Sequence, residues 1–522
     1  MKNSVNRRGR RAAAGAVVAL SVLAVSACGG ANGDASGDAE MSDLTLVLRN
    51  DPDSFDPAIT AAESGATQVH EALYDTLIRR DIETGEYVPA MATEWEVSPT
   101  KVDFVLKDGL KCADGTDLLP TDIAKSIERL GDPETGSIYT GRVFGPAGFK
   151  AATADDEANT VSVEVNEPHT DLLEGLRNAF IVCPKGLADT EALATEPQGS
   201  GPYKLVSKSR GDTYVFERWD SPAVDNIEEL PEKITMRVVT SEATRANMLE
   251  TGEADIISLL GRDAQRLEGK YEAILGEGYF ADTLVFNQRP GEPGADPLVR
   301  EAVALALDAE DYTTAASFGL GEPIDTIYTP NMDCYTESNG ELKPQQDLDA
   351  AKAKLAEAGY GPGGKTLTLR LLGYDAQNSG PDYVAETLRG LGIEVDITNG
   401  TLAQGAGIIY GDEGLWDIFV FPMMTASPIP YPLVTKMSSN LGEGGAYNFG
   451  RVQNEEFDRL AGEATSQTGE ERCETWGKAE AALLERVDAV PLMWPIAHYF
   501  ADGVTFQTEH RTIDLRSIRL SD

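Results

Sequence analysis

The sequence predicts an α/β protein with at least two lobes. Its 522 residues exceed the length that one hydrophobic core usually organises, even after an N-terminal leader is removed. Paired strand patterns dominate the first half of the chain, and helix and strand patterns alternate through the second half. Such alternation is typical of a mostly parallel sheet covered by helices, so we expect that architecture in the second half.

The leader occupies residues 1–27 and predicts export. Basic residues precede an apolar stretch over 12–27, which is shorter than the about 20 residues that a bilayer span needs. Cys28 follows the small pair Ser26-Ala27 and resembles a bacterial lipobox, in which the thiol is acylated by fatty acids such as palmitate. An ordinary signal peptide with an incidental cysteine is the alternative. Arg7-Arg8 leaves the Sec and twin-arginine routes of export both open.

Residues 28–42 predict a flexible linker, because they are polar and small with almost nothing apolar to bury. No later stretch is apolar enough to span a bilayer, so we expect a protein held on the outer face of the cell membrane by lipid. The formal charge is −42, which argues against binding to nucleic acid or to an anionic lipid surface, since both need basic patches. Halophilic adaptation is an alternative cause of this acidity.

The first half of the folded part predicts short strands around two helices. The strand patterns end at turn-forming residues, and the strands are expected at 44–48, 102–106, 160–165, 203–207 and 213–217. The strand at 160–165 has an edge-like pattern that Pro168 closes. The helices are expected at 64–79, where apolar side chains share one face, and at 121–130, capped by Thr121-Asp122.

The second half predicts helices and strands in regular alternation. At 347–358, Asp347 caps a helix whose residues Leu348, Ala351 and Leu355 share one face. The other helices are expected at 297–307, 383–391, 454–464 and 470–486. The strands are expected at 367–372, 393–397, 416–421 and 490–494.

No catalytic constellation stands out in the sequence. Residues 359–366 match the P-loop pattern of nucleotide-binding proteins, in which Gly is followed by any four residues and then by Gly-Lys-Thr or Gly-Lys-Ser. A phosphate-binding loop of this kind, however, requires a strand, a loop and then a helix. Here a helix precedes the glycines and a strand follows them, so they predict a helix C-cap and a turn. His70-Glu71 is not followed by a second histidine at the spacing of the His-Glu-x-x-His motif, so the zinc-protease motif is absent from this segment. We therefore expect no enzyme, no cofactor and no metal site.

Four cysteines remain besides Cys28, and they are Cys112, Cys183, Cys334 and Cys473. An even number in an exported chain permits disulfides, and four cysteines allow three pairings that these arguments leave open. Four buried free thiols are the alternative.

Short motifs along the chain resemble the extracytoplasmic solute-binding proteins of ABC transporters, family 5, the oligopeptide, dipeptide and nickel-type binders. The clearest is Gly-Ser-Gly-Pro-Tyr at 199–203, which is similar to the family's Gly-Thr-Gly-Pro-Tyr. Each motif is weak alone, but their order along the chain is specific. The matching segments are 54–57, 71–77, 89–95, 106–122, 199–203, 299–308, 349–360 and 490–492.

The resemblance implies a two-lobed periplasmic-binding-protein-like fold (type II, cluster C-like) whose lobes close like a hinge on a ligand. Lobe I is expected over 43–283 with an inserted subdomain at about 77–194, lobe II over 287–494, and a C-terminal return to lobe I over 495–522. Within this division we predict the disulfides Cys112–Cys183 and Cys334–Cys473, because each pair lies inside one lobe and would not lock the hinge.

The resemblance also places the ligand in the cleft between the lobes. Its walls are expected to come from the first loop, the segment around Tyr139, the stretch after the 416–421 strand and the region of Tyr447. The expected ligand-lining residues are Glu63, Tyr139, Phe421, Met423, Met424, Thr425, Tyr447 and Asn448. Core packing is the alternative for the two methionines and for the tyrosines.

One position departs from the family's peptide binders, in which an Asp of the stretch after the 416–421 strand pairs with the α-ammonium of the peptide. Ala426 stands where that acid belongs, and residues 421–435 carry no charge. Because burying an ammonium without a counter-charge costs several kcal/mol, we expect a solute with an uncharged end or an end capped by amide groups.

The function implied by the resemblance is capture of a peptide-like or other small organic solute by a monomeric protein and its delivery to an ABC permease for import. An extracellular hydrolase of peptides or glycans and a ligand-sensing receptor on the same fold are the alternatives. The absence of nucleophile–base motifs favours the binding protein over the hydrolase.

Overall fold

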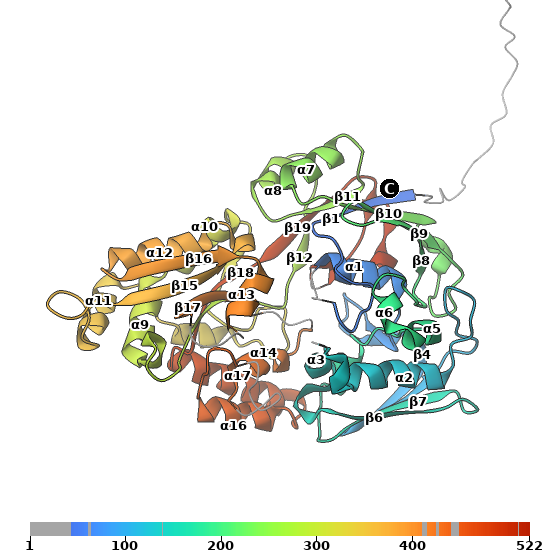
Figure 1. The fold of residues 1–522 in the computed structure, drawn as a ribbon, viewed down its shortest axis with the longest axis horizontal. Coiled ribbons are helices and arrows are strands. Elements are labelled where there is room, and N and C mark those ends of the chain that lie inside the picture. The colour runs from blue at the N-terminus through green and yellow to red at the C-terminus, as the bar shows by residue number, and fades with distance from the viewer. Residues whose placement is uncertain are drawn as a thin grey trace, which may run out of the picture. The chain divides into compact units, whose positions relative to one another are not determined.

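A computed structural model describes residues 43–60, 64–137, 139–409, 415–423, 427–439, 448–509 and 511–521 (Figure 1). Two large sheets and one smaller sheet organise these residues. No helix among the described residues combines the length and apolar character that crossing a bilayer requires.

The first large sheet has seven strands in the order β12-β19-β11-β1-β10-β9-β8. The apolar strand β1 pairs in parallel with β10. Strand β19, which comes near the end of the chain, lies between β11 and β12. The predicted hairpin of 203–207 with 213–217 is confirmed as β8 and β9. The strands are β1 (Asp43–Leu48), β8 (Tyr203–Ser209), β9 (Thr213–Arg218), β10 (Lys233–Val238), β11 (Ile256–Leu259), β12 (Ile274–Glu277) and β19 (Ile496–Ala501).

A four-stranded sheet in the order β4-β5-β7-β6 lies against α2 (Pro120–Gly131). The expectation of an edge strand at 160–165 is wrong, because β7 pairs with both β5 and β6. Its alternating valines bury one face only, and an interior antiparallel strand shows the same pattern. The strands are β4 (Ala92–Ser98), β5 (Lys101–Leu106), β6 (Phe149–Asp155) and β7 (Thr160–Val165).

Both helices of the first half differ from prediction at one end. Helix α1 spans Ser64–Leu73 and stops well before residue 79, because the carbonyl of Leu73 accepts the amide of Gly201 at 3.0 Å. The chain then enters β2 (Ile78–Arg80), which pairs with β3 (Tyr87–Pro89).

Helix α2 starts one position earlier than its predicted cap. Leu119 is the N-cap residue and Pro120 opens the helix. The side chain of Asp122 turns back to accept the amide of Leu119 at 3.2 Å, so this acid belongs to the first turn rather than to the cap.

The second large sheet has six strands in the order β14-β18-β13-β17-β15-β16. It is mixed rather than mostly parallel, because β13 runs antiparallel to both neighbours while β15 is parallel to β16 and β17. Asp282 and Thr283, which we placed in lobe I, already pair within this sheet. The strands are β13 (Asp282–Phe286), β14 (Glu322–Pro323), β15 (Thr368–Tyr374), β16 (Glu394–Gly400), β17 (Ile418–Pro422) and β18 (Ala489–Trp494).

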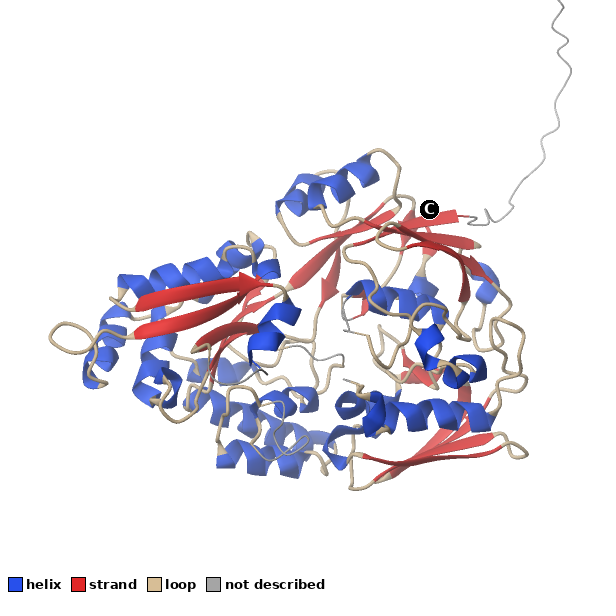
Figure 2. Ribbon diagram, viewed as in Figure 1, coloured by secondary structure: helices blue, strands red, loops and turns tan. Residues whose placement is uncertain are grey.

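Helices accompany this second sheet, as the alternating pattern predicts (Figure 2). Asp347 caps α11, accepting the amides of Asp349 and Ala350 at 3.0 and 2.9 Å. The glycine-rich stretch 359–366 forms the turn between α11 and β15, which confirms that it is no phosphate cradle. The helices are α9 (Pro297–Ala306), α10 (Ala309–Ser317), α11 (Leu348–Glu357), α12 (Gly380–Gly390), α16 (Glu455–Ala464) and α17 (Gly469–Glu485).

The remaining elements are short. The helices among them are α3 (Thr140–Phe144), α4 (Leu172–Leu176), α5 (Pro184–Ala188), α6 (Thr190–Leu193), α7 (Glu242–Glu250), α8 (Arg262–Leu267), α13 (Leu402–Ile409) and α14 (Tyr431–Met437). The strands are β20 (Val504–Thr505), β21 (Thr508–Glu509), β22 (Thr512–Ile513) and β23 (Arg519–Leu520).

The hydrophobic cores follow the sheets. One core joins the seven-stranded and four-stranded sheets, with Leu46, Phe216 and Phe104 as members. Two other cores draw only on the second half, around Trp476 and around Leu371. We call the described residues of 43–277 and 496–521, which build the first core and its two sheets, lobe I, and those of 279–494, which hold the six-stranded sheet and the other two cores, lobe II.

Candidate interlobe site

Short polar contacts join the lobes. Thr170 of lobe I donates its amide to the carbonyl of Thr465 at 3.2 Å. The side-chain amide of Asn178 donates to the hydroxyl of Ser427 at 2.9 Å. These partners lie about 250 to 295 positions apart in the sequence, so a local sequence pattern could not predict the contacts between them.

An ion pair lies in the same interlobe region. One guanidinium nitrogen of Arg472 on α17 contacts both carboxylate oxygens of Asp171 at 2.5 and 2.7 Å. Both side chains are less than a tenth exposed. Burial raises the pKa of Asp171, and Arg472 opposes that rise. Removing either partner would leave a charge buried without compensation whenever the lobes meet in this way.

His169 lies next to this pair on the lobe I side. Its ring centroid is 5.6 Å from that of Tyr431 on α14, in an edge-to-face arrangement. Burial and, to a lesser degree, the cation of Arg472 lower the pKa of His169 to about 4. At neutral pH this histidine is therefore an uncharged packing partner across the lobes.

Tyr139, one of the predicted ligand-lining residues, is half-buried at the start of α3. It lines a small cavity together with Asn178 and Phe180, so the structure brings it next to a residue that bridges the lobes. Burial raises the pKa of Tyr139 to about 12, with Arg142 opposing the rise and Asp53 adding to it.

Three other predicted residues lie in packed or hydrogen-bonded surroundings in this structure. Phe421 is 8% exposed and stacks against Phe419 and Phe449, with ring centroids 5.2 and 5.1 Å away. Met423 is fully buried in the same core, and its predicted role in ligand binding stays a prediction. The side-chain nitrogen of Asn448 donates to the carbonyl of Val452 at 2.7 Å, and its side-chain oxygen accepts the amide of Val452 at 2.9 Å. This side chain therefore stabilises a turn.

Several predicted positions lie outside the described residues. They are Cys28, Glu63, Met424, Thr425, Ala426 and Tyr447. Their predicted roles in lipidation and ligand binding stay predictions.

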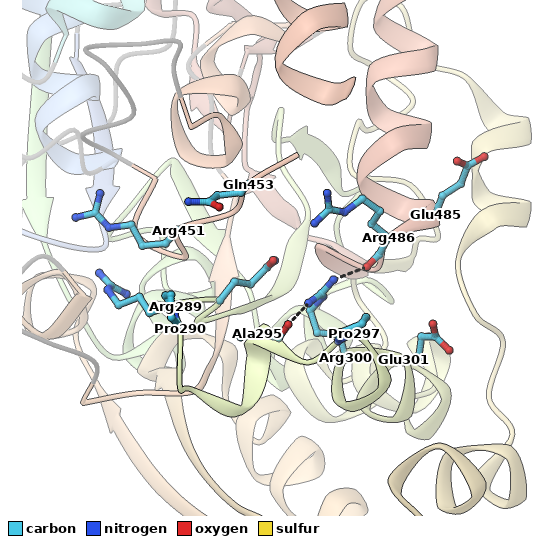
Figure 3. A pocket seen from close by; sticks show the side chains of 11 residues that line it. Arg289, Pro290, Ala295, Pro297, Arg300, Glu301, Arg451, Gln453, Glu485 and Arg486 are labelled. Carbon is cyan, nitrogen blue, oxygen red and sulfur yellow. Dashed lines mark hydrogen bonds between the residues drawn. The ribbon is translucent and has the colours of Figure 1, made fainter. Parts of the chain in front are cut away.

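A cavity of about 810 Å³ lies in lobe II, away from the predicted site (Figure 3). Four arginines line it, namely Arg289, Arg300, Arg451 and Arg486. Arg300 is occupied structurally, since it donates to the carbonyls of Gly294, Val487 and Arg486 at 2.9 to 3.0 Å. No described residue of the predicted site lines this cavity.

The structure joins the cysteines in the pairs proposed from the resemblance. Cys112 is bonded to Cys183 in lobe I, and Cys334 to Cys473 in lobe II, with Cα atoms 6.1 and 4.5 Å apart. Each bond stays within one lobe, so neither ties the lobes together. The second bond lies beside the ion pair, because a guanidinium nitrogen of Arg472 is 3.8 Å from the Cys334 sulfur.

Known proteins resemble this chain in sequence. The model of the bacterial extracellular solute-binding proteins, family 5, matches residues 86–445. The chain is 27% identical over 486 residues to the periplasmic murein peptide-binding protein MppA of Escherichia coli K12, covering 87% of this chain and 88% of that one. It is also 25% identical over 540 residues to protein XP55 of Streptomyces lividans, covering 96% of this chain and 93% of that one.

Solved structures show the same fold. A substrate-binding protein of Microbacterium hydrocarbonoxydans, complexed with 4-hydroxybenzoate hydrazide, superposes with a TM-score of 0.77 at 28% identity, covering 92% of this chain and all of the other. DppA of Helicobacter pylori, in complex with the peptide STSA, has a TM-score of 0.79 at 21% identity over 92% of this chain and 98% of the other. This chain therefore has the two-lobed fold of these binding proteins and belongs to the bacterial extracellular solute-binding proteins of family 5.

Proposed function

We propose that this protein is lipid-anchored through Cys28, captures a small organic solute between its lobes and delivers it to an ABC permease for import. The polar contacts between the lobes support capture by closure, because they give the closed form partners that an open form would leave to water. The leader and the polar linker support the anchor.

The observation that carries the solute class is the alanine at position 426. The uncharged stretch 421–435 offers no carboxylate for a peptide α-ammonium. The Microbacterium relative is complexed with an aromatic hydrazide, which has no α-ammonium, whereas MppA is named for a murein peptide. A solute without an ammonium to be paired here agrees with the hydrazide complex of the Microbacterium relative.

Two measurements test this proposal. Native mass spectrometry of protein purified without refolding is expected to show a co-purified small molecule. Calorimetric titration with dipeptides to pentapeptides is expected to show no advantage of a free N-terminus over an acetylated one. Submicromolar binding that needs the free N-terminus would mean that another acid, such as Glu63 or Asp412, supplies the counter-charge, and the proposed solute class would be wrong.

A further inference from the structure

We propose that the arginine-lined cavity of lobe II binds a phosphate group between Arg289 and Arg451. The cavity measures about 810 Å³, and its lining includes four arginines and two glutamates. This concentration of guanidinium groups contrasts with a chain of 86 acidic and 44 basic residues, and it favours an anionic ligand. The inference goes beyond solute capture, because the cavity lies apart from the contacts that join the lobes.

Two backbone segments that meet closely bring Arg289 and Arg451 to the same end of the cavity. The amide of Gln288 donates to the carbonyl of Gly450 at 2.7 Å. A Cβ atom at Gly450 would lie 2.7 Å from a carbonyl oxygen of β13, so the absence of a side chain there permits this approach. One guanidinium nitrogen of Arg289 also donates to the carbonyl of Phe449 at 2.9 Å. Figure 3 shows the two arginine side chains extending in the same direction from these segments.

No acid of the protein neutralises these two arginines. Arg289 donates to uncharged oxygens, those of the Asn287 side chain and the Phe449 carbonyl, each at 2.9 Å. Within the described ranges, no carboxylate lies at ion-pair distance from either guanidinium, and the guanidinium of Arg451 has no hydrogen-bond acceptor. Burial and then the charge of Arg451 lower the pKa of Arg289, whereas Glu292 opposes that change. An anion between the two cations would replace their repulsion by attraction.

The other charged groups of the cavity are placed differently. Arg300 and Arg486 lie 3.6 and 3.4 Å from the buried carboxylate of Asp488. The two glutamates, Glu301 and Glu485, lie on the opposite side of Figure 3 from the two unpaired arginines. One end of the cavity therefore carries two positive charges without a neighbouring acid.

The backbone of Arg451 provides an independent observation. Its φ is 54°, in the left-handed region that residues other than glycine, asparagine and aspartate adopt rarely. A turn holds it there, because the amide of Arg451 donates to the carbonyl of Asn448 at 3.1 Å. Glycine would adopt this conformation with less strain, so the arginine side chain is present at a cost in stability. Strain of this kind is concentrated at binding and active sites.

Two guanidinium groups match a phosphate better than a carboxylate. A carboxylate carries one charge, and a single arginine can bind it through two parallel hydrogen bonds. A phosphate monoester carries a charge of about −1.5 to −2 at pH 7 and has three acceptor oxygens, so it can offset both arginines at once. The volume of the cavity leaves room for an organic group attached to the phosphate.

Calorimetry with inorganic phosphate, phenyl phosphate and benzoate tests the site. The variants are Arg451→Gln, Arg451→Lys and Arg451→Gly, and Arg459→Gln, an exposed change on α16, is the control for net charge. Thermal melts of every variant establish that it is folded. Because glycine relieves the left-handed backbone, Arg451→Gly is expected to keep the melting temperature of the wild type, which separates loss of the site from loss of the fold.

We expect the wild type to bind phenyl phosphate more tightly than benzoate. Arg451→Gln and Arg451→Gly are expected to weaken phosphate binding roughly 10- to 100-fold, the range of a hydrogen bond to a charged group. Arg451→Lys is expected to weaken it less, since lysine keeps the charge but not the paired donors. Arg459→Gln is expected to bind like the wild type.

Both sources of the phosphate group are distinguished by the same titrations. Equal affinity for inorganic phosphate and its phenyl ester would support a site for the free ion, and tighter binding of the ester would support a site that also holds the organic group. Failure of both phosphates to bind the wild type, or phosphate binding that Arg451→Gln leaves unchanged, would overturn the site. Benzoate binding as tight as that of phenyl phosphate would overturn the assignment to phosphate.

Discussion

At the scale of single residues, the Asp171–Arg472 ion pair is the more deeply buried of two described ion pairs that depend on how the lobes meet, the other being Arg80–Asp333 at 3.8 Å. Its two side chains come from positions 301 apart and are nearly buried. When the lobes separate, both groups can be hydrated. The pair therefore contributes to the equilibrium between open and closed forms more than to the folding of either lobe.

Asp171→Asn is expected to weaken solute binding and to shift the protein toward its open form. Loss of the carboxylate leaves the cation of Arg472 buried in the closed form, a situation that costs about 3–5 kcal/mol in other proteins. Small-angle scattering with and without solute, together with calorimetry, measures both effects. Arg459→Gln, an exposed change on α16, is the control, and an unchanged affinity and scattering curve for Asp171→Asn would contradict the assignment.

At the scale of elements, Glu480 ties α17 to the loops beside it. Its carboxylate accepts the amides of Ile327 and Tyr328 at 2.7 and 2.8 Å and the side-chain amide of Asn339 at 2.7 Å. The side chain is fully buried. Burial raises the pKa of Glu480 to about 7, although its three hydrogen bonds oppose the rise.

The raised pKa of Glu480 gives stability a pH dependence. Between about pH 4.5 and 7 the folded protein holds a proton on Glu480 that the unfolded chain has released, so this residue's contribution to the free energy of unfolding falls as pH rises. Denaturant unfolding of the wild type and of Glu480→Gln at a series of pH values measures it. We expect the difference between the two proteins to change across this window; a difference independent of pH would show that Glu480 does not titrate there.

At the scale of the whole molecule, the formal charge of −42 gives the chain no net attraction to an anionic membrane surface. The predicted lipid on Cys28 would supply attachment to the membrane, and the polar linker over 28–42 would let the lobes reach a permease. Acidity itself favours solubility and opposes adsorption to anionic lipid.

Cys28→Ser is expected to abolish membrane partition of the mature protein. The hydroxyl of serine does not replace the thiol that is acylated, so the variant accumulates as unprocessed precursor or in a soluble fraction. Fractionation followed by intact-mass measurement distinguishes the forms, and Ser36→Ala, a change within the predicted linker, is the control. Membrane partition equal to that of the wild type would refute the anchor.

The sequence by itself determined those features that depend on neighbours a few positions apart. The alternating valines predicted the strand β7, and Asp347 predicted the start of α11. The order of helix and strand around 359–366 argued against a phosphate-binding loop. The order of short motifs was enough to indicate the family.

Tertiary structure alone decided where distant segments meet. Helix α1 ends at Leu73 because the amide of Gly201 takes its carbonyl, and β13 makes the second sheet mixed by entering between two antiparallel partners. The contacts of Arg472 with Asp171 and of Asn178 with Ser427 likewise join the two halves of the chain. Periodicity and capping report interactions within a few residues, whereas these contacts exist only once two separately formed cores are placed against each other.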